Sequence, residues 1–465
     1  MLFGSIVKSS LVAKCRLGSL IISILMVIKL AAGLRHGWQE IPGWEAYWIA
    51  QAINAGHGYS FPSDEPWPLN PFGENGYHAT AWADPFYTYL LAGIIALAGE
   101  YHQLAAVVLN LICLLGIFGA THLLAERVIS PYAGLPAVLL LALNPELGYA
   151  TMQMNNATVA ALLVLLSALA LTRFLRNSSR RNSGLLGLML GLTVLGAPGA
   201  QLFIPIAAVA AAVSGRAQKG ALVNAAIIGL VAVTTIFPWT LRNYAVFGEL
   251  VPVRTGIGHI SMTSVIGPGV AALPKSLPHS IEPPWDAQSP RQAVLESVRS
   301  KAKRNALEVG FLDRYTRTLA PPDYSNLNEA RRDAWLLSQT KAYLRENPGV
   351  AAQLALGKLE VVAGIMGPLG IVILVLAVLS GVSAIRKLEP TALTLAMFAA
   401  SYLGPFLIVT CYFSRYRAPI EPILTILALL GIWKLTSYGL KNLDQAALSK
   451  FWHQIKVPRR TPPPA

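Results

Sequence analysis

One short stretch, FPWTLRNYAVFGELVPV (residues 237–253), combines residue types that could bind an anion at a membrane surface. It closes a long apolar run, and Pro238 is expected to kink or end a helix there because proline lacks a backbone N–H. Trp239 is typical of the aromatic belt at a membrane interface. Arg242 adds a planar, permanently charged guanidinium that can grip phosphate through two hydrogen bonds. Its side chain could reach lipid phosphate groups or form a fixed site for a phosphate handled at the membrane surface.

The composition indicates a membrane protein. The chain has 465 residues, of which 54% are hydrophobic and only 13% are charged. Apolar runs of about 18 or more residues, the length that a bilayer core requires, recur along it. The formal net charge is +14, but much of the excess lies in short loops and tails, where the positive-inside rule explains it. No recognition motif accompanies this charge, so we expect no nucleic-acid partner.

The apolar runs predict an all-α polytopic protein with about ten transmembrane helices. A weaker run at 85–98 covers 14 residues, a length that suits an interfacial or re-entrant helix better than a crossing. Ten crossings place the short basic loops 173–182, 214–220 and 384–390 on the cytoplasmic side together with both termini. We therefore expect a multi-pass protein of the inner or plasma membrane with an uncleaved first span.

Four regions follow from this map. Residues 1–241 form an N-terminal transmembrane module that includes a first outer loop, 35–102. Residues 242–357 form a long outer loop with amphipathic helices, 358–440 the C-terminal transmembrane helices and 441–465 a basic cytoplasmic tail. In the long loop, residues 328–359 have helical spacing, with Asn328 as a possible N-cap and Pro348 dividing two helices.

The first outer loop is rich in carboxylates and has one arginine, Arg35. Its acidic residues are Glu40, Glu45, Asp64, Glu65, Glu74, Asp84 and Glu100. Asp84 directly precedes Pro85, which is the pattern of a helix N-cap followed by proline at the first helical position.

Other kinds of chemistry lack support. The three cysteines have no metal-ligand spacing, and His57 and His78 with nearby acids match no known metal site. No P-loop and no G-x-S-x-G motif is present, so ATP hydrolysis and serine-hydrolase chemistry are not expected. The sequence implies no cofactor and leaves the need for a divalent metal open.

The opening stretch resembles the one that closes a central span in bacterial glycosyltransferases of the C-type (GT-C) superfamily. These are relatives of protein O-mannosyltransferases and of the lipid A aminoarabinose transferases. Residues 44–61, 328–348 and 414–428 are similar to further family segments in the same order, so the resemblance runs from about residue 40 to 436. The residues that match in the opening stretch are Pro238, Trp239, Arg242, Asn243, Tyr244, Phe247 and Gly248.

The resemblance implies transfer of a sugar from a polyprenyl-phosphate donor to an acceptor on the outer face, with inversion. The acceptor stays open between protein, lipid and glycan. Glu45 is the expected catalytic base; because IPGWEAY lacks the family's usual aspartate, Glu40 is the alternative. Asp84 is expected close to the reaction centre. Candidates for binding the donor phosphate are Arg242, Asn243, Arg415, Arg417 and, more weakly, Lys358.

Two other functions remain open. A transporter or flippase of a lipid-linked saccharide would have charged or broken helices at mid-membrane depth and a repeat between halves. The GAPGAQ break at 196–201 favours it, whereas the acidic first loop and the lack of an internal repeat favour the transferase. The third possibility is a non-catalytic relative that binds a lipid-linked saccharide.

Overall fold

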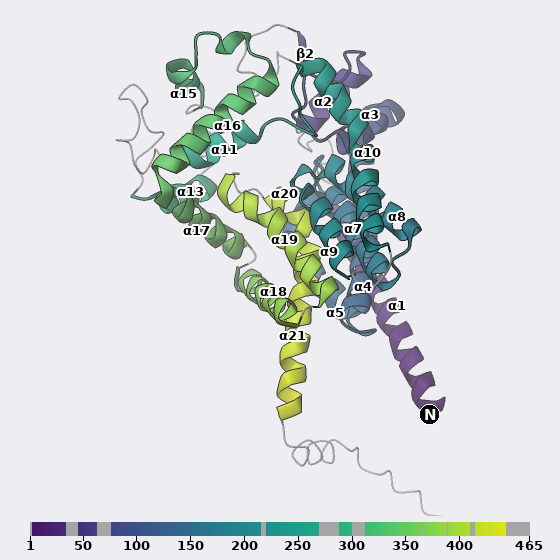
Figure 1. Ribbon diagram of the computed structural model, residues 1–465. Helices are drawn as coiled ribbons and strands as arrows, with labels where there is room; N and C mark the ends of the chain where they lie inside the picture. The colour runs from purple at the N-terminus through teal and green to yellow at the C-terminus, as the bar shows by residue number, and fades with distance from the viewer. Residues whose placement is uncertain are drawn as a thin grey trace, which may run out of the picture.

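The computed structural model describes residues 2–33, 45–62, 76–214, 220–268, 288–299, 312–365, 367–387, 389–409 and 414–442. This part of the chain is helical apart from one small sheet (Figure 1). Its α-helices are α1 Leu2–Gly33, α2 Glu45–Asn54, α3 Pro85–Ala98, α4 His102–Val128, α5 Gly134–Ala142, α6 Pro145–Thr151, α7 Ala157–Arg176, α8 Arg180–Gly196, α9 Phe203–Ser214, α10 Ala221–Phe247, α11 Ile257–Ser261, α13 Pro290–Arg299, α15 Leu312–Leu319, α16 Glu329–Glu346, α17 Pro348–Ile365, α18 Gly367–Lys387, α19 Pro390–Val409, α20 Ser414–Arg417 and α21 Glu421–Asn442.

Among the described residues, 7 helical stretches are long and apolar enough to cross a membrane. They are Leu11–Ala32, Pro85–Val128, Ala157–Arg176, Ala221–Phe247, Gly370–Lys387, Pro390–Leu407 and Ala418–Ser437. The predicted all-helical, multi-pass architecture is confirmed at this level. A count of about ten would also need α5, α8 and α9, which have only 9, 17 and 12 residues, and it stays a prediction.

The expected helix at 85–98 is present with those bounds as α3. Gly99 follows it with a positive φ of 54°, a conformation that glycine adopts without steric cost. The 3-10 turn Gly99–Tyr101 then leads directly into α4. By length and composition, α3 and α4 count as one apolar stretch, so an interfacial position for α3 also stays a prediction.

The bundle is held by close helix packing. α8 lies along α10, and α4 and α7 pack beside each other. Gly187 and Gly191, one turn apart on α8, make the first contact close. A Cβ on Gly187 would lie 2.7 Å from the carbonyl oxygen of Ile228, and one on Gly191 would lie 2.6 Å from the Cβ of Thr235. Small residues at this spacing let two membrane helices approach closely.

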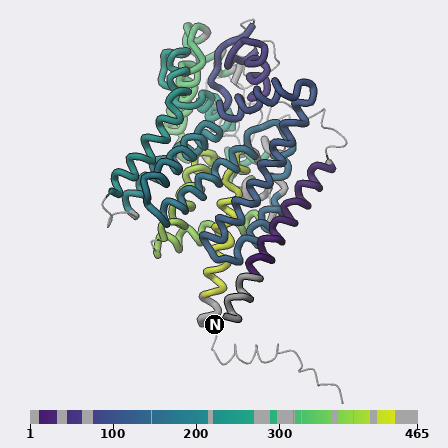
Figure 2. Tube along the Cα trace, turned by 90° about the vertical axis from the view of Figure 1, so that its right-hand side faces the viewer, coloured from purple at the N-terminus to yellow at the C-terminus, as the bar shows by residue number. Residues whose placement is uncertain are grey.

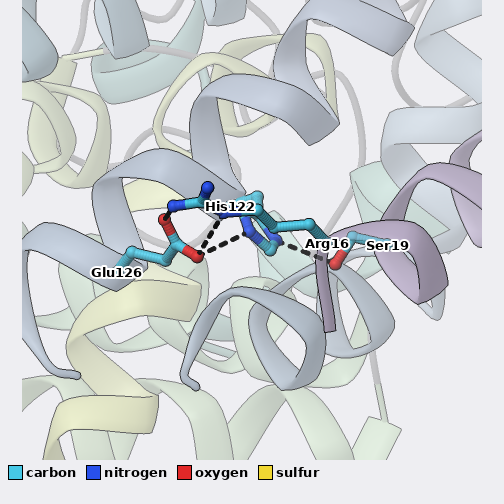
Figure 3. Close-up of polar contacts among 4 residues, drawn as sticks. All are labelled: Arg16, Ser19, His122 and Glu126. Carbon is cyan, nitrogen blue, oxygen red and sulfur yellow. Dashed lines mark hydrogen bonds and ion pairs between the residues drawn. The ribbon is translucent and has the colours of Figure 1, made fainter. Parts of the chain in front are cut away.

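In Figure 2, helix α1 runs along one side of the bundle. A network of polar side chains joins α1 to the bundle. Arg16 makes two hydrogen bonds to Glu126, at 3.2 and 3.0 Å, and His122 Nε2 lies 3.0 Å from the same carboxylate (Figure 3). The hydroxyl of Ser19 lies 2.8 Å from His122 Nδ1. The side chain of His122 fills the space where a Cβ on Gly134 would lie. The network therefore fixes how α1 and α4 meet, and α5 approaches it through a glycine.

The long-loop helices form a separate layer at the end of the bundle that also carries α2 and the sheet (Figure 1). The sheet pairs β1 (Ser60–Pro62) antiparallel with β2 (Tyr77–Ala79), with Phe61 opposite His78. The side chain of Asn328 accepts a hydrogen bond from the backbone amide of Arg331 at 3.0 Å. Pro348 begins α17 directly after α16. Both local predictions for this loop, the cap and the division into two helices, are confirmed.

Candidate active site

Polar side chains from five separate segments line one small cleft at this end of the bundle. Glu45 begins α2, Asp84 precedes α3, the asparagine pair precedes α7, and Arg254 follows α10. The structure therefore brings Glu45 and Asp84 together, two of the three carboxylates predicted from the sequence. The lining residues are Glu45, Ala46, Trp82, Ala83, Asp84, Asn155, Asn156, Arg254 and Tyr416.

Asp84 occupies the N-cap position of α3, but its side chain does not cap the helix. Its backbone is extended, with φ −72° and ψ 130°, and Pro85 follows at the start of the helix. The side chain makes no capping hydrogen bond; instead, Oδ1 accepts one of 2.9 Å from the side-chain amide of Asn156. Asn156 is itself held by a 3.2 Å hydrogen bond to the carbonyl of Gly196. The buried carboxylate is thus directed into the cleft rather than back onto its own helix.

Glu45 is half-buried and lies near His259 of α11. Burial lowers the pKa of His259 to about 3 and outweighs the charge of Glu45, which acts in the opposite direction. The imidazole is therefore neutral at physiological pH, and it contacts Trp82 edge to face at 5.1 Å between ring centroids. His259 therefore supports the Trp82 side of the cleft wall as a neutral ring and contributes no positive charge to the cleft.

Arg254 is the cation of the cleft, and sequence reasoning missed it. Its Nε donates to the carbonyl of Thr255 at 3.2 Å, and its guanidinium carbon lies 5.9 Å from the centroid of the Trp82 ring. A guanidinium in a pocket with amides and carboxylates suits a phosphate group that must be held in a fixed orientation. Its sequence signal was its place directly after the stretch 237–253.

Arg242 points elsewhere and has internal partners. Its guanidinium donates to the carbonyl oxygens of Thr80 and Tyr59, at 2.7 and 2.8 Å. It also lies over the rings of Tyr59 and Trp239, at 5.3 and 5.0 Å from their centroids. Arg242 does not line the cleft. Its contacts fasten the sheet of the first loop to the end of α10.

Asn243 and Trp239 fasten the segment that leads to Arg254. The amide of the fully buried Asn243 donates to the carbonyls of Val251 and Val253, at 3.0 and 3.1 Å. The indole of Trp239 donates to the same Val253 carbonyl at 2.5 Å. Trp239 and Asn243, two of the residues on which the family resemblance rests, thus fix the backbone just before Arg254 and so position Arg254 at the cleft.

The remaining predicted residues lie differently. Arg417, 2% exposed, pairs with the fully buried Glu421 one turn later, beside Tyr416 of the cleft wall. Lys358 is buried in α17 and does not line the cleft. The backbone of Arg415 belongs to α20, but its side chain lies outside the described part of the structure, as does the whole of Glu40.

Within the described ranges, no group of three or more His, Cys, Asp and Glu side chains is arranged to hold a metal ion. The cleft itself contributes two carboxylates and two side-chain amides. The polar groups that line the cleft therefore include carboxylates, side-chain amides and one guanidinium.

Five of the nine cleft-lining residues, Trp82, Ala83, Asp84, Asn155 and Asn156, lie in a part of the chain that matches a known protein family. Residues 79–240 match the family model described as dolichyl-phosphate-mannose-protein mannosyltransferase. A comparison with curated proteins found no match.

The chain is similar to two structures of an oligosaccharyltransferase from Archaeoglobus fulgidus. The apo form is 14% identical, with a TM-score of 0.50 over 92% of this chain and 52% of that one. The same organism's AglB, in complex with an inhibitory peptide and a dolichol-phosphate, is 14% identical, with a TM-score of 0.50 over 96% and 52%. The chain thus spans about half the length of these oligosaccharyltransferase chains. At this identity, the likeness shows the fold.

ArnT from Cupriavidus metallidurans in the apo state is 15% identical over 87% of this chain and 77% of that one. The TM-score of this comparison is 0.32. The family match covers Asp84, both cleft asparagines and Trp239. Over residues 79–240, the chain is therefore similar to the dolichyl-phosphate-mannose-protein mannosyltransferase family.

Proposed function

We propose that this protein transfers a sugar from a polyprenyl-phosphate donor to an acceptor hydroxyl bound in the cleft. One observation carries the proposal: two carboxylates, Glu45 and Asp84, line the same cleft as the guanidinium of Arg254. Carboxylates can accept a proton, and a fixed cation can stabilise a departing phosphate. The family match over residues 79–240 supports the same donor class.

In the proposed reaction, the acceptor oxygen attacks the anomeric carbon from the side opposite the phosphate. The new carbon–oxygen bond forms as the bond from the sugar to the phosphate oxygen breaks, and that electron pair leaves with the polyprenyl phosphate. The acceptor's proton passes to a carboxylate, and the anomeric configuration inverts. Arg254 stabilises the charge that grows on the leaving phosphate.

The two carboxylates have different surroundings, which supports different tasks. Glu45 is the more exposed and can meet an incoming hydroxyl, so we assign it the role of general base. Asp84 is 5% exposed and held by Asn156. We assign it the stabilisation of positive charge that develops on the sugar ring as the bond to phosphate breaks.

The positive-inside rule supports an extracytoplasmic cleft. α7 begins at Ala157, next to the cleft asparagines, and ends at Arg176, so its 20 residues cover about 30 Å, the thickness of a bilayer core. The short loop after it is basic and belongs on the cytoplasmic side. With ten crossings, both termini would lie on that side too.

The test uses membrane vesicles that contain the protein, a panel of labelled polyprenyl-phosphate monosaccharides and extracted acceptors. Glu45→Gln should lower transfer by about 10²–10⁴-fold, the contribution typical of a general base. Glu100→Gln is the matched control, because Glu100 is an exposed acid of the same outer loop. Equal transfer by Glu45→Gln, Asp84→Asn and the wild type would refute the proposal. Donor binding without any transfer would favour a non-catalytic binder, and movement of intact donor across the membrane would favour a flippase.

A further inference from the structure

A second polar cavity lies at the opposite end of α7 from the cleft. It has a volume of about 540 Å³ and is lined by Arg127, Arg173, Arg176, Asn177, Ser179, Arg181 and Asn182. We call it the basic pocket. Its four arginines come from the last turns of α4 and α7 and from the first turn of α8, so three elements converge on it.

Hydrogen bonds between these elements build the basic pocket. Arg176 Nη2 donates to the carbonyl of Arg127 at 2.7 Å, which ties the end of α7 to the end of α4. The buried amide of Asn182 donates to the carbonyl of Asn177 at 2.7 Å. From α10, Asn224 donates to the carbonyl of Ser178 at 3.1 Å. The connection between α7 and α8 is therefore held in shape from both sides.

Among the described residues, the positive charge of the basic pocket has no acidic partner. No acidic residue lines it, and in the part of the chain that the structure describes, none of its four arginines makes an ion pair. Glu126, the neighbour of Arg127, is already bonded to Arg16 and His122. Four guanidinium groups around one cavity repel one another, and an anion with several oxygens would relieve that repulsion.

Topology alone does not account for this arrangement. The positive-inside rule requires basic residues in a short cytoplasmic loop but does not require them to share a cavity. The loop itself provides the comparison, because Arg180 belongs to it and does not line the basic pocket. The attraction of arginines to the carbonyl ends of α4 and α7 explains Arg127, Arg173 and Arg176 but not Arg181, which lies in the first turn of α8.

We propose that the basic pocket binds the phosphate headgroup of an anionic phospholipid from the leaflet opposite the cleft. Its arginines lie at the ends of apolar helices, where headgroups lie, and basic pockets between such ends suit lipids with more than one phosphate. The cavity is larger than a single phosphate requires. The site shares no lining residue with the cleft, so this proposal does not depend on the transfer reaction.

The test measures lipid bound to the intact protein in nanodiscs of phosphatidylcholine with or without cardiolipin. The double variant Arg173→Gln/Arg181→Gln should retain roughly 25-fold less cardiolipin in native mass spectrometry, since each arginine near a headgroup contributes about 1 kcal/mol, or fivefold. It should also lose the rise in melting temperature that cardiolipin gives the wild type. The control Arg180→Gln/Arg386→Gln removes the same charge from exposed arginines of two basic loops and should behave like the wild type.

Three results would overturn the proposal. The first is equal cardiolipin retention by the wild type and the Arg173→Gln/Arg181→Gln variant. The second is an equal loss in the control variant, which would show that loop charge alone attracts lipid. The third is stabilisation by inorganic phosphate or pyrophosphate in pure phosphatidylcholine with no response to cardiolipin, which would assign the pocket to a soluble anion.

Discussion

The side-chain amide of Asn156 donates a 2.9 Å hydrogen bond to Asp84, a residue 72 positions earlier in the chain. This bond connects the first outer loop to the start of α7 and orients a buried carboxylate in the cleft. It is a direct side-chain link between two segments that lie far apart in the sequence.

Asn156→Ala should therefore lower kcat by about tenfold or more while leaving KM nearly unchanged, because a mispositioned charge affects the transition state more than the bound substrate. Steady-state transfer assays on purified protein in nanodiscs measure both constants. Asn326→Ala, at an exposed asparagine of the outer layer, is the control. An unchanged kcat would remove Asp84 from the proposed chemistry.

Arg242 distinguishes a structural role from phosphate binding. Arg242→Lys replaces the rigid guanidinium, whose two terminal nitrogens donate to Thr80 and Tyr59, with a single ammonium nitrogen. It should therefore destabilise the fold by about 1–3 kcal/mol, the cost of leaving a buried carbonyl without a donor. We expect a lower melting temperature and faster proteolysis of the first loop. The exposed Arg345 provides the control Arg345→Lys. A raised KM for the donor at an unchanged melting temperature would instead identify Arg242 as a phosphate ligand.

Glu329 connects the long loop to the cleft wall. Its carboxylate accepts hydrogen bonds from the Thr80 hydroxyl at 2.6 Å, from the Ala81 amide at 3.0 Å and from the Thr255 hydroxyl. Glu329→Ala should cost about 2–4 kcal/mol, because hydrogen bonds to a charged group contribute about 1.5–3 kcal/mol. Thermal unfolding in detergent measures this, with the exposed Glu346→Ala on the same helix as the comparison. A melting temperature equal to that of the comparison variant would contradict this role.

Asp333 gives a pH-dependent prediction. Burial raises its pKa from 3.8 to about 6, although backbone amides of Gly258 and His259 donate to it at 2.8 and 3.0 Å. A raised pKa in the folded state means that the group's stabilising contribution is complete below pH 3.8 and is lost as the pH rises through about 6.

Asp333→Asn keeps an acceptor oxygen but cannot ionise. The free energy of unfolding of the variant should therefore rise relative to that of the wild type by up to about 2 kcal/mol between pH 4 and 6. Melting temperatures of both proteins across this range provide the test, and taking the difference cancels the groups that they share. The exposed Asp323→Asn serves as control. A difference that stays constant with pH would show that Asp333 ionises normally.

Local signals in the sequence predicted local structure well. The α3 helix follows from Pro85 and an apolar run, and the division between α16 and α17 follows from Asn328 and Pro348, because caps and breaks depend on neighbouring residues. Glu45 and Asp84 are predictable as candidates because the family resemblance implies catalytic carboxylates in the acidic first outer loop.

The partners of these residues could not be read in the same way. Arg242 carries the family resemblance, yet its guanidinium is bonded to carbonyls far away in the sequence, which no local pattern reveals. Arg254 has no unusual neighbours and becomes part of the cleft through contacts that Asn243 and Trp239 make with the preceding backbone. Long-range packing decides which arginine faces the cleft.

The contact between Gly258 and α16 connects the outer layer of the protein to the cleft wall. A Cβ on Gly258 would collide with the backbone carbonyl of Asp333, so the backbones of α11 and α16 lie in direct contact, and the Asp333 side chain accepts hydrogen bonds from the amides of Gly258 and His259. Because His259 of α11 contacts Trp82 of the cleft lining, an antibody fragment bound to the exposed residues of α16 would hold a helix whose backbone touches the element behind this wall.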